Sequence, residues 1–185
     1  MSYTSLDDLR RTRLLLVDDD EVNLLLTAAA LREHGFDVTE ATSGVHALEQ
    51  LQTCGCDMVV LDALMPGLDG FETCARLRAM AGYESLPVLM LTGLDDEASR
   101  AYQVGATDFF VKSMQWSLLA GRLRYLMRSA RTRQELERSK AKLARAQDLA
   151  RMGSFEWHRK VPGGFTISAE GLRVFGRGPQ ERLDF

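Results

Sequence analysis

Four places along the chain carry side chains that together could bind a metal ion and transfer a phosphoryl group. Asp18 and Asp19 follow one short apolar run, Asp62 and Thr92 follow two others, and Lys112 follows an aromatic run. Carboxylate oxygens are the ligands that a hard ion such as Mg²⁺ prefers. A lysine and a hydroxyl can hold phosphoryl oxygens, and an aspartate can act as the nucleophile that forms an aspartyl phosphate. These residue types therefore indicate metal-assisted phosphoryl chemistry.

The elements that must position these side chains can be predicted from the hydrophobic pattern. The apolar runs are too short for helices and suit buried strands. Helical patterns separate them, and Gly35 and Gly105 are natural helix ends. The predicted strands are residues 14–17, 36–40, 58–61, 88–91 and 109–111, and the predicted helices are residues 24–34, 45–51, 71–80 and 95–104.

This alternation of strands and helices predicts an α/β fold. We expect a flavodoxin-like (βα)5 arrangement, which is a doubly wound parallel sheet with the strand order 2-1-3-4-5, followed by a long C-terminal helix. In such a sheet the carboxyl ends of the strands lie together at one rim, where ligands bind. Three carboxylates gathered there repel one another unless a cation lies between them, which favours Mg²⁺ or Mn²⁺ as the cofactor.

Each of these residues also has a structural interpretation. An aspartate after a strand commonly caps the next helix, a threonine in a strand fits β-propensity, and a single lysine is usually solvated. Because all of them follow consecutive strands in the order that the chemistry requires, we favour the functional interpretation of the set.

Charge divides the chain near residue 112. Residues 1–111 carry 7 Lys and Arg against 19 Asp and Glu, a net charge of −12, whereas residues 112–151 carry 11 against 3, a net charge of +8. Between Leu118 and Gly153 the only glycine is Gly121, and good helix formers dominate. This stretch predicts one helix of about 30 residues, longer than most helices of globular proteins.

The second half of this long helix has a sparse heptad pattern. Leu136, Leu143 and Ala150 recur every seven residues, with Ser139 and Ala146 between them. The seam favours a coiled coil between two copies of the chain, and a solvated linker helix is the alternative. Nucleic-acid binding by the basic helix is disfavoured, because it lacks interleaved aromatic residues and a helix-turn-helix partner.

Composition argues against several other classes of protein. No run approaches the ~20 apolar residues that span a membrane, and the polar first dozen residues do not resemble a signal peptide, so we expect a cytoplasmic protein without a membrane partner. Cys54, Cys56 and Cys74 form neither a disulfide framework nor a zinc-ligand set. We therefore expect free thiols.

The motifs that carry these residues resemble the receiver domain of two-component response regulators. They are Leu-Leu-Val-Asp-Asp-Asp-Glu at residues 15–21, Val-Leu-Asp-Ala-Leu-Met-Pro-Gly-Leu-Asp-Gly at 60–70, Leu-Thr-Gly at 91–93 and Asp-Phe-Phe-Val-Lys at 108–112. The resemblance covers about residues 12–128 and implies a phosphoacceptor function.

The resemblance implies a role for each acidic residue. Asp62 would accept a phosphoryl group from the phosphohistidine of a sensor histidine kinase or of a phosphotransfer protein. Asp19 would bind Mg²⁺ directly, Asp18 would bind it through water, and the backbone carbonyl of Leu64 would be a further ligand.

The remaining motif residues would hold and sense the phosphoryl group. Thr92 and Lys112 would contact its oxygens, Gly93 would leave its path open, and Phe109, with Thr92, would form the switch. In one departure from the family, Ser113 replaces the proline that usually follows the lysine, often through a cis bond. Because a non-proline cis bond costs about 3–4 kcal/mol, the bond here is either trans or held under strain.

After Gly153 the pattern changes again. Residues 154–159 and 165–167 are predicted strands around a turn at 162–164, and a helix is predicted from Ser168 to Phe175. Ala-Arg-Met-Gly-Ser-Phe-Glu-Trp at 150–157 and Ser-Ala-Glu-Gly-Leu-Arg-Val-Phe-Gly at 168–176 resemble the opening of a PAS sensor domain. We expect a polar lead (residues 1–12), a receiver (13–128), a helical linker and candidate coiled coil (129–152) and the truncated start of a PAS-like domain (153–185).

The leading hypothesis is a phosphorylation-controlled switch that relays a signal to a C-terminal output, with no enzymatic activity in this segment beyond self-dephosphorylation. The resemblance implies an output such as a cyclic-di-GMP synthase, a phosphodiesterase or a histidine kinase. The alternative is a receiver that is weakly phosphorylated and serves as a dimerisation platform in a cyclic-di-GMP protein or hybrid kinase. A dehalogenase-type phosphatase is disfavoured, because it requires a second Asp two residues after Asp62, where Leu64 stands.

Overall fold

The computed structural model describes residues 12–53, 55–93, 98–150, 155–157, 165–167, 169–174 and 176. They fall into two compact units, Met1–Ala130 and Arg131–Phe185. The predicted start of the fourth helix, at Asp95, lies outside the described residues. Each unit is described by itself.

The first unit is built on a five-stranded sheet in the order β2-β1-β3-β4-β5, with every neighbouring pair parallel. The predicted strand order is therefore confirmed. The strands are β1 (Arg13–Val17), β2 (Asp37–Ala41), β3 (Met58–Asp62), β4 (Val88–Thr92) and β5 (Asp108–Val111). Every residue of β3 and β4 is buried, as expected for central strands that are covered on both faces.

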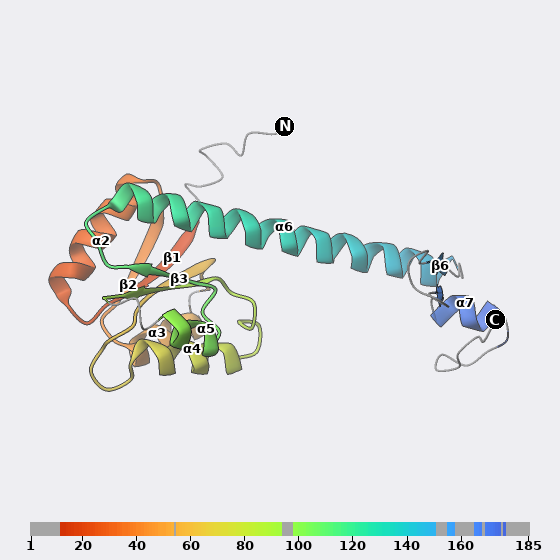
Figure 1. The fold of residues 1–185 in the computed structure, drawn as a ribbon, viewed down its shortest axis with the longest axis horizontal. Coiled ribbons are helices and arrows are strands. Elements are labelled where there is room, and N and C mark those ends of the chain that lie inside the picture. The colour runs from red at the N-terminus through yellow and green to blue at the C-terminus, as the bar shows by residue number, and fades with distance from the viewer. Residues whose placement is uncertain are drawn as a thin grey trace. The chain divides into compact units, whose positions relative to one another are not determined.

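Helices cover both faces of this sheet (Figure 1). One face packs against α2 (Glu21–Glu33) and the first part of α6 (Trp116–Leu149), and the other packs against α3 (Gly44–Thr53), α4 (Gly70–Ala79) and α5 (Ala98–Gln103). Alternate residues of β1 enter the two cores: Leu14 and Leu16 face α2, whereas Leu15 and Val17 face α3. Because both faces of the sheet are packed, the residues at the ends of its strands are held in fixed positions.

Local capping explains where these helices begin. Asp20 caps α2, because its side chain accepts the backbone N–H groups of Val22 and Asn23 at 2.9 and 3.2 Å. The predicted cap of α3 is confirmed, because Ser43 Oγ accepts the N–H of His46 at 3.2 Å. The predicted end of α2 is also confirmed, with Gly35 following it in the left-handed region at φ 92°.

The predicted long helix is confirmed as α6, which runs for 34 residues. Leu119, Leu123 and Leu126 near its start are buried in the core. In the second unit its heptad leucines, Leu136 and Leu143, are 53% and 61% exposed. No helix in the described part of the chain is long and apolar enough to cross a membrane.

Beyond the long helix, the second unit contains a small antiparallel pair of strands, β6 (Phe155–Trp157) and β7 (Phe165–Ile167), and the short helix α7 (Ala169–Val174). These elements agree with the predicted strands and helix. The predicted turn at 162–164, the cap Ser168 and the last predicted helical residue, Phe175, lie outside the described residues.

Candidate functional site

The sheet gathers the predicted site residues at the carboxyl ends of its strands. Asp18 and Asp19 follow β1, Asp62 and Thr92 are the last residues of β3 and β4, and Lys112 follows β5. The sheet hydrogen bonds continue to the rim, where the N–H of Lys112 donates to the Thr92 carbonyl at 2.7 Å. The rim positions are therefore fixed by the register of the sheet.

Three carboxylates meet at this rim. One carboxylate oxygen from each of Asp18, Asp19 and Asp62 lies within 4.8 Å of the others. Asp18 and Asp62 are only 3% and 5% exposed, whereas Asp19 is exposed to solvent. Asp20 also belongs to the acidic run after β1, but its side chain caps α2. Its backbone N–H donates to Asp18 Oδ1 at 2.9 Å and so helps to position Asp18.

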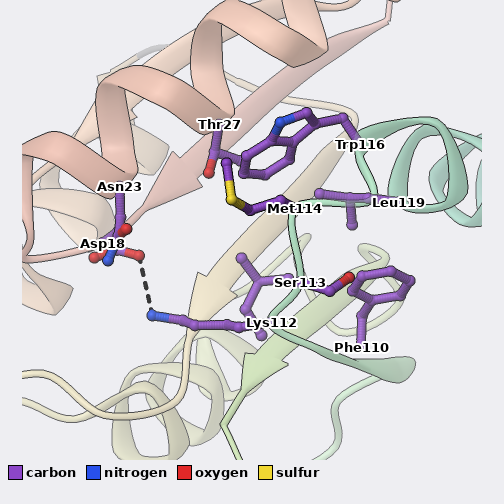
Figure 2. Close-up of a pocket in the computed structure, with 10 residues that line it drawn as sticks. Asp18, Asn23, Thr27, Phe110, Lys112, Ser113, Met114, Trp116 and Leu119 are labelled. Carbon is purple, nitrogen blue, oxygen red and sulfur yellow. Dashed lines mark hydrogen bonds and ion pairs between the residues drawn. The ribbon is translucent and has the colours of Figure 1, made fainter.

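Lys112 offsets part of the negative charge of this cluster. Its Nζ lies 2.7 Å from Asp62 Oδ1 and 3.2 Å from Asp18 Oδ2, the second contact being drawn in Figure 2. Burial raises the pKa of the Asp62 carboxyl, and the hydrogen bond and charge of Lys112 act in the opposite direction. Burial also lowers the pKa of Lys112, but the hydrogen bonds and charges of Asp62 and Asp18 outweigh it, so that pKa is raised.

The loop after β3 passes against the backbone of Asp62. A Cβ added at Gly70 would lie 2.0 Å from the Asp62 carbonyl oxygen, so only glycine fits there. The N–H of Gly70 donates to the Ala63 carbonyl at 3.0 Å, and the backbone of Leu64 contributes a hydrogen bond to the Asp62 carboxylate that lowers its pKa. Gly70 is not among the site residues predicted from the sequence, although it is the last residue of the 60–70 motif.

The bond between Lys112 and Ser113 is trans, because no cis peptide bond occurs among the described residues. Ser113, which replaces the proline usual in the family, therefore follows Lys112 through a trans bond and not through a strained cis bond. Lys112 reaches both Asp62 and Asp18 from this backbone.

The predicted switch residues lie on neighbouring strands, with Thr92 at the end of β4 and Phe109 two residues before the end of β5. Thr92 is fully buried, and a side chain added at Gly93 would meet nothing within 4 Å. The Phe109 ring packs against the core on the α4 side and meets the Tyr102 ring edge-on, with centroids 5.8 Å apart. Tyr102, whose hydroxyl lies 3.3 Å from Asp108 Oδ1, was missed by the sequence analysis because no local pattern pairs it with Phe109.

A pocket of about 210 Å³ adjoins the acidic cluster and shares Asp18 and Lys112 with it (Figure 2). Its other lining residues come from α2, β4, β5 and the segment that begins α6: Asn23, Thr27, Leu91, Phe110, Ser113, Met114, Trp116 and Leu119. Small-molecule sites are typically about 300–1,000 Å³, so the pocket is small for a separate ligand site. It opens one flank of the acidic cluster beside the Lys112 side chain.

The donor set at the rim fits a hard divalent cation. The three clustered side chains offer only oxygen atoms, and Mg²⁺ is commonly held by one or two carboxylates together with water and a phosphate oxygen. Asp19 leaves one side of the cluster open to solvent, whereas Asp18 and Asp62 are buried.

Comparisons with known proteins identify the family of the chain. A family model of the response regulator receiver domain matches residues 14–124, more than half of the chain. The chain belongs to this family. Receiver domains bind Mg²⁺ at an acidic pocket, and a cluster of aspartates is present in this chain.

Among relatives of known name, RegX3, a sensory transduction protein of Mycobacterium tuberculosis, is 35% identical over 119 residues. These residues cover 63% of this chain and 51% of RegX3. The response regulator PleD of Caulobacter vibrioides is 34% identical over 131 residues, which cover 70% of this chain and 29% of PleD. The receiver chain thus spans about half or less of the length of these relatives.

Solved structures show the same fold. The chemotaxis response regulator CheY4 of Vibrio cholerae superposes with a TM-score of 0.59 at 29% identity, covering 62% of this chain and 98% of CheY4. The response regulator TrrA of Thermotoga maritima, solved in complex with Mg²⁺-BeF, superposes with a TM-score of 0.57 at 27% identity, covering 62% of this chain and 98% of TrrA.

Proposed function

We propose that this receiver accepts a phosphoryl group on Asp62 in a Mg²⁺-dependent reaction. The observation that supports the proposal most directly is the bridging position of Lys112, whose Nζ contacts both Asp62 and Asp18 at the rim. A buried nucleophile beside a cation and two further carboxylates has the charges that phosphoryl transfer needs. The donor would be the phosphohistidine of a sensor kinase or of a phosphotransfer protein.

In the transfer step, a carboxylate oxygen of Asp62 attacks the phosphorus. The bond from phosphorus to the donor histidine nitrogen breaks, and that nitrogen keeps the electron pair. Lys112 then turns its ammonium from the Asp62 carboxylate to an oxygen of the bound phosphoryl group, and Thr92 donates its hydroxyl to another. The open space at Gly93 leaves room for the incoming group.

Asp19 and Asp62 would hold the Mg²⁺ directly, the Leu64 carbonyl would complete the protein ligands, and Asp18 would hold a metal-bound water. When bound, the ion would supply positive charge to the phosphoryl oxygens. The resemblance to TrrA, which was solved with Mg²⁺-BeF, supports this assignment.

The test is phosphorylation of the full chain by acetyl phosphate with and without Mg²⁺, followed by intact mass. The unmodified chain should gain the mass of one phosphoryl group only with Mg²⁺, and Asp62→Asn should gain none while keeping its circular dichroism spectrum. Asp57→Asn, which changes a carboxylate at the opposite edge of the sheet, is the control. Undiminished labelling of Asp62→Asn would refute the assignment.

The signal would pass from Asp62 through Thr92 and Phe109 to the surface of the receiver and along α6 to a C-terminal PAS or output domain. Phosphorylation adds charge at one point and biases an element with two arrangements. A cytoplasmic location and the division into lead, receiver, linker and PAS-like start remain predictions of the same proposal.

The exposed heptad leucines of α6 favour a second role, as a platform that pairs two copies of the chain through the receiver surface and the linker. Light scattering with and without beryllofluoride, which mimics the phosphoryl group, separates the two roles. A mass that rises with the mimic supports a switch that works through pairing, and a dimer that ignores the mimic supports a platform.

A further inference from the structure

A three-residue contact connects the loop after Asp62 with the helix after Thr92. Arg100 on α5 extends to the start of α4, where its Nη2 lies 3.2 Å from Asp69 Oδ2. The guanidinium carbon of Arg100 also lies 3.9 Å from the centre of the Phe71 ring. The ion pair uses the charge of the guanidinium, and the cation–π contact uses its flat face. Together the two contacts fix the orientation of the group.

The α4 end of this contact lies directly against the candidate phosphoacceptor. Asp69 and Phe71 flank Gly70, whose backbone is so close to Asp62 that a Cβ there would lie 2.0 Å from the Asp62 carbonyl oxygen. Asp69 is held in place as the cap of α4, because its Oδ1 accepts the N–H of Glu72 at 2.7 Å. Phe71 is 1% exposed and therefore cannot move easily.

The other end of the contact is on the short helix α5. The helix α5 is only six residues long. Its Ala101 is buried, and its half-exposed Tyr102 contacts Phe109 and Asp108 on β5. A helix of this length is marginal by itself, so contacts with neighbouring elements determine its position. It also follows β4, the strand that ends at Thr92.

We propose that Arg100 is a positioning residue, and that its contacts with Asp69 and Phe71 latch α5 in the arrangement of the unphosphorylated receiver. This inference rests on the proposed function, because it assumes that phosphorylation at Asp62 moves Thr92 and the helix that follows it. The latch opposes that movement, so releasing it lowers the free energy needed to reach the phosphorylated arrangement. The receiver then binds a phosphoryl mimic more tightly.

The test uses two variants of the full chain that break the latch from opposite sides. Arg100→Met removes the charge and the planar group, and Asp69→Asn removes the charge but keeps a good helix cap. Arg76→Gln is the matched control. It removes the exposed ion pair between Arg76 and Glu72 within α4, whose charged atoms lie 2.6 Å apart, and this pair does not involve α5. Arg100→Lys keeps the charge without the planar stack and should have an intermediate effect.

Two measurements are needed. The first is the affinity for beryllofluoride with Mg²⁺, which should rise about three- to tenfold in Arg100→Met and less in Asp69→Asn, given the usual strength of exposed ion pairs and cation–π contacts. The second is amide hydrogen exchange without beryllofluoride at Val104, whose N–H donates to the Arg100 carbonyl in α5 at 3.2 Å. Exchange there should quicken in both latch variants and stay unchanged in Arg76→Gln.

The outcomes distinguish the latch from the proposed function. Unchanged or weaker beryllofluoride binding in Arg100→Met, with the unmodified chain binding normally, would overturn the latch. Unchanged exchange at Val104 would overturn it as well, because α5 would then not be restrained by Arg100. If the unmodified chain fails to bind beryllofluoride, the proposed function fails, and the exchange measurement alone decides whether Arg100 restrains α5.

Discussion

Charged residues are arranged differently at the two ends of the strands of the central sheet. We call these ends the amino edge and the carboxyl edge; the carboxyl edge is the rim described above. At the amino edge, Arg13 and Asp57 form an ion pair at 3.2 Å with side chains 55% and 32% exposed, and the backbone N–H of Arg13 also donates to Asp57. At the carboxyl edge, Asp18 and Asp62 are buried and share the single ammonium of Lys112.

The difference follows from what each edge can do. A balanced, exposed pair contributes little to stability and offers no chemistry, because solvent screens both charges. Two buried carboxylates with one cation leave an excess of negative charge, which a second cation can offset. The excess negative charge at the carboxyl edge therefore lowers the local stability of the fold and, for the same reason, allows this edge to bind a cation.

The largest expected effect comes from the backbone at the carboxyl edge. Gly70→Ala would place a Cβ against the Asp62 carbonyl, and relieving that overlap must shift backbone, so we expect the free energy of unfolding to fall by about 3 kcal/mol. Gly93→Ala, at the same edge but in open space, should change it by less than about 0.5 kcal/mol. Urea denaturation measures both, and equal effects would contradict the close approach at Gly70.

Next comes the cation. In Lys112→Met the two buried carboxylates face each other without a partner, and we expect a loss of about 2 kcal/mol in the unfolding free energy without metal, reduced from the value for fully buried pairs because Lys112 is partly exposed. Arg13→Met at the amino edge should cost less than about 1 kcal/mol. If both variants lose the same amount in urea, the contrast between the edges is wrong.

Much of this contrast could be predicted from the sequence, because it depends on local patterns. Each strand and the residue that ends it are adjacent in the chain, so the order of the sheet and the positions of Asp62 and Lys112 followed from short apolar runs. Asp20 was harder, because an aspartate that caps a helix and one that faces a metal look alike in sequence.

What could not be predicted are contacts that depend on how separate helices meet. The latch joins Arg100 to Asp69 and Phe71 across about thirty residues, and the close approach at Gly70 appears only once the loop after β3 has folded back. Neither has a periodic signal, since each requires the docking of α4 and α5 to be known. Trans geometry at Ser113 was likewise one of two alternatives until the fold was in hand.

A third prediction uses metal to test the excess charge at the carboxyl edge. Mg²⁺ should raise the midpoint of thermal unfolding, and at about ten times its dissociation constant it should stabilise the receiver by about 1.4 kcal/mol. Asp19→Ala removes a proposed direct ligand that is exposed, so it should lose most of this gain while changing metal-free stability little. An equal gain in Asp19→Ala would show that Mg²⁺ binds elsewhere.

The smallest expected effect is at the amino edge and concerns the thiol of Cys56. Cys56 carries a free thiol, and burial raises its pKa to about 11 from an ordinary value of 9.0. Because the pKa of Cys56 is higher in the folded chain than in the unfolded chain, the folded state favours the neutral thiol. Its contribution to the unfolding free energy is fully present below pH 9. That contribution is lost between pH 9 and about 11, as the unfolded chain releases the proton first.

We therefore expect the unfolding free energy of the unmodified chain to fall by about 1 kcal/mol more than that of Cys56→Ala between pH 8.5 and 10.5, after allowance for the partial exposure of the thiol. The constant cost of the lost side chain cancels, because only the slope with pH is compared. Cys74, whose pKa burial also raises, is present in both proteins and contributes equally. Parallel slopes would mean that the Cys56 thiol is as solvated in the folded chain as in the unfolded one.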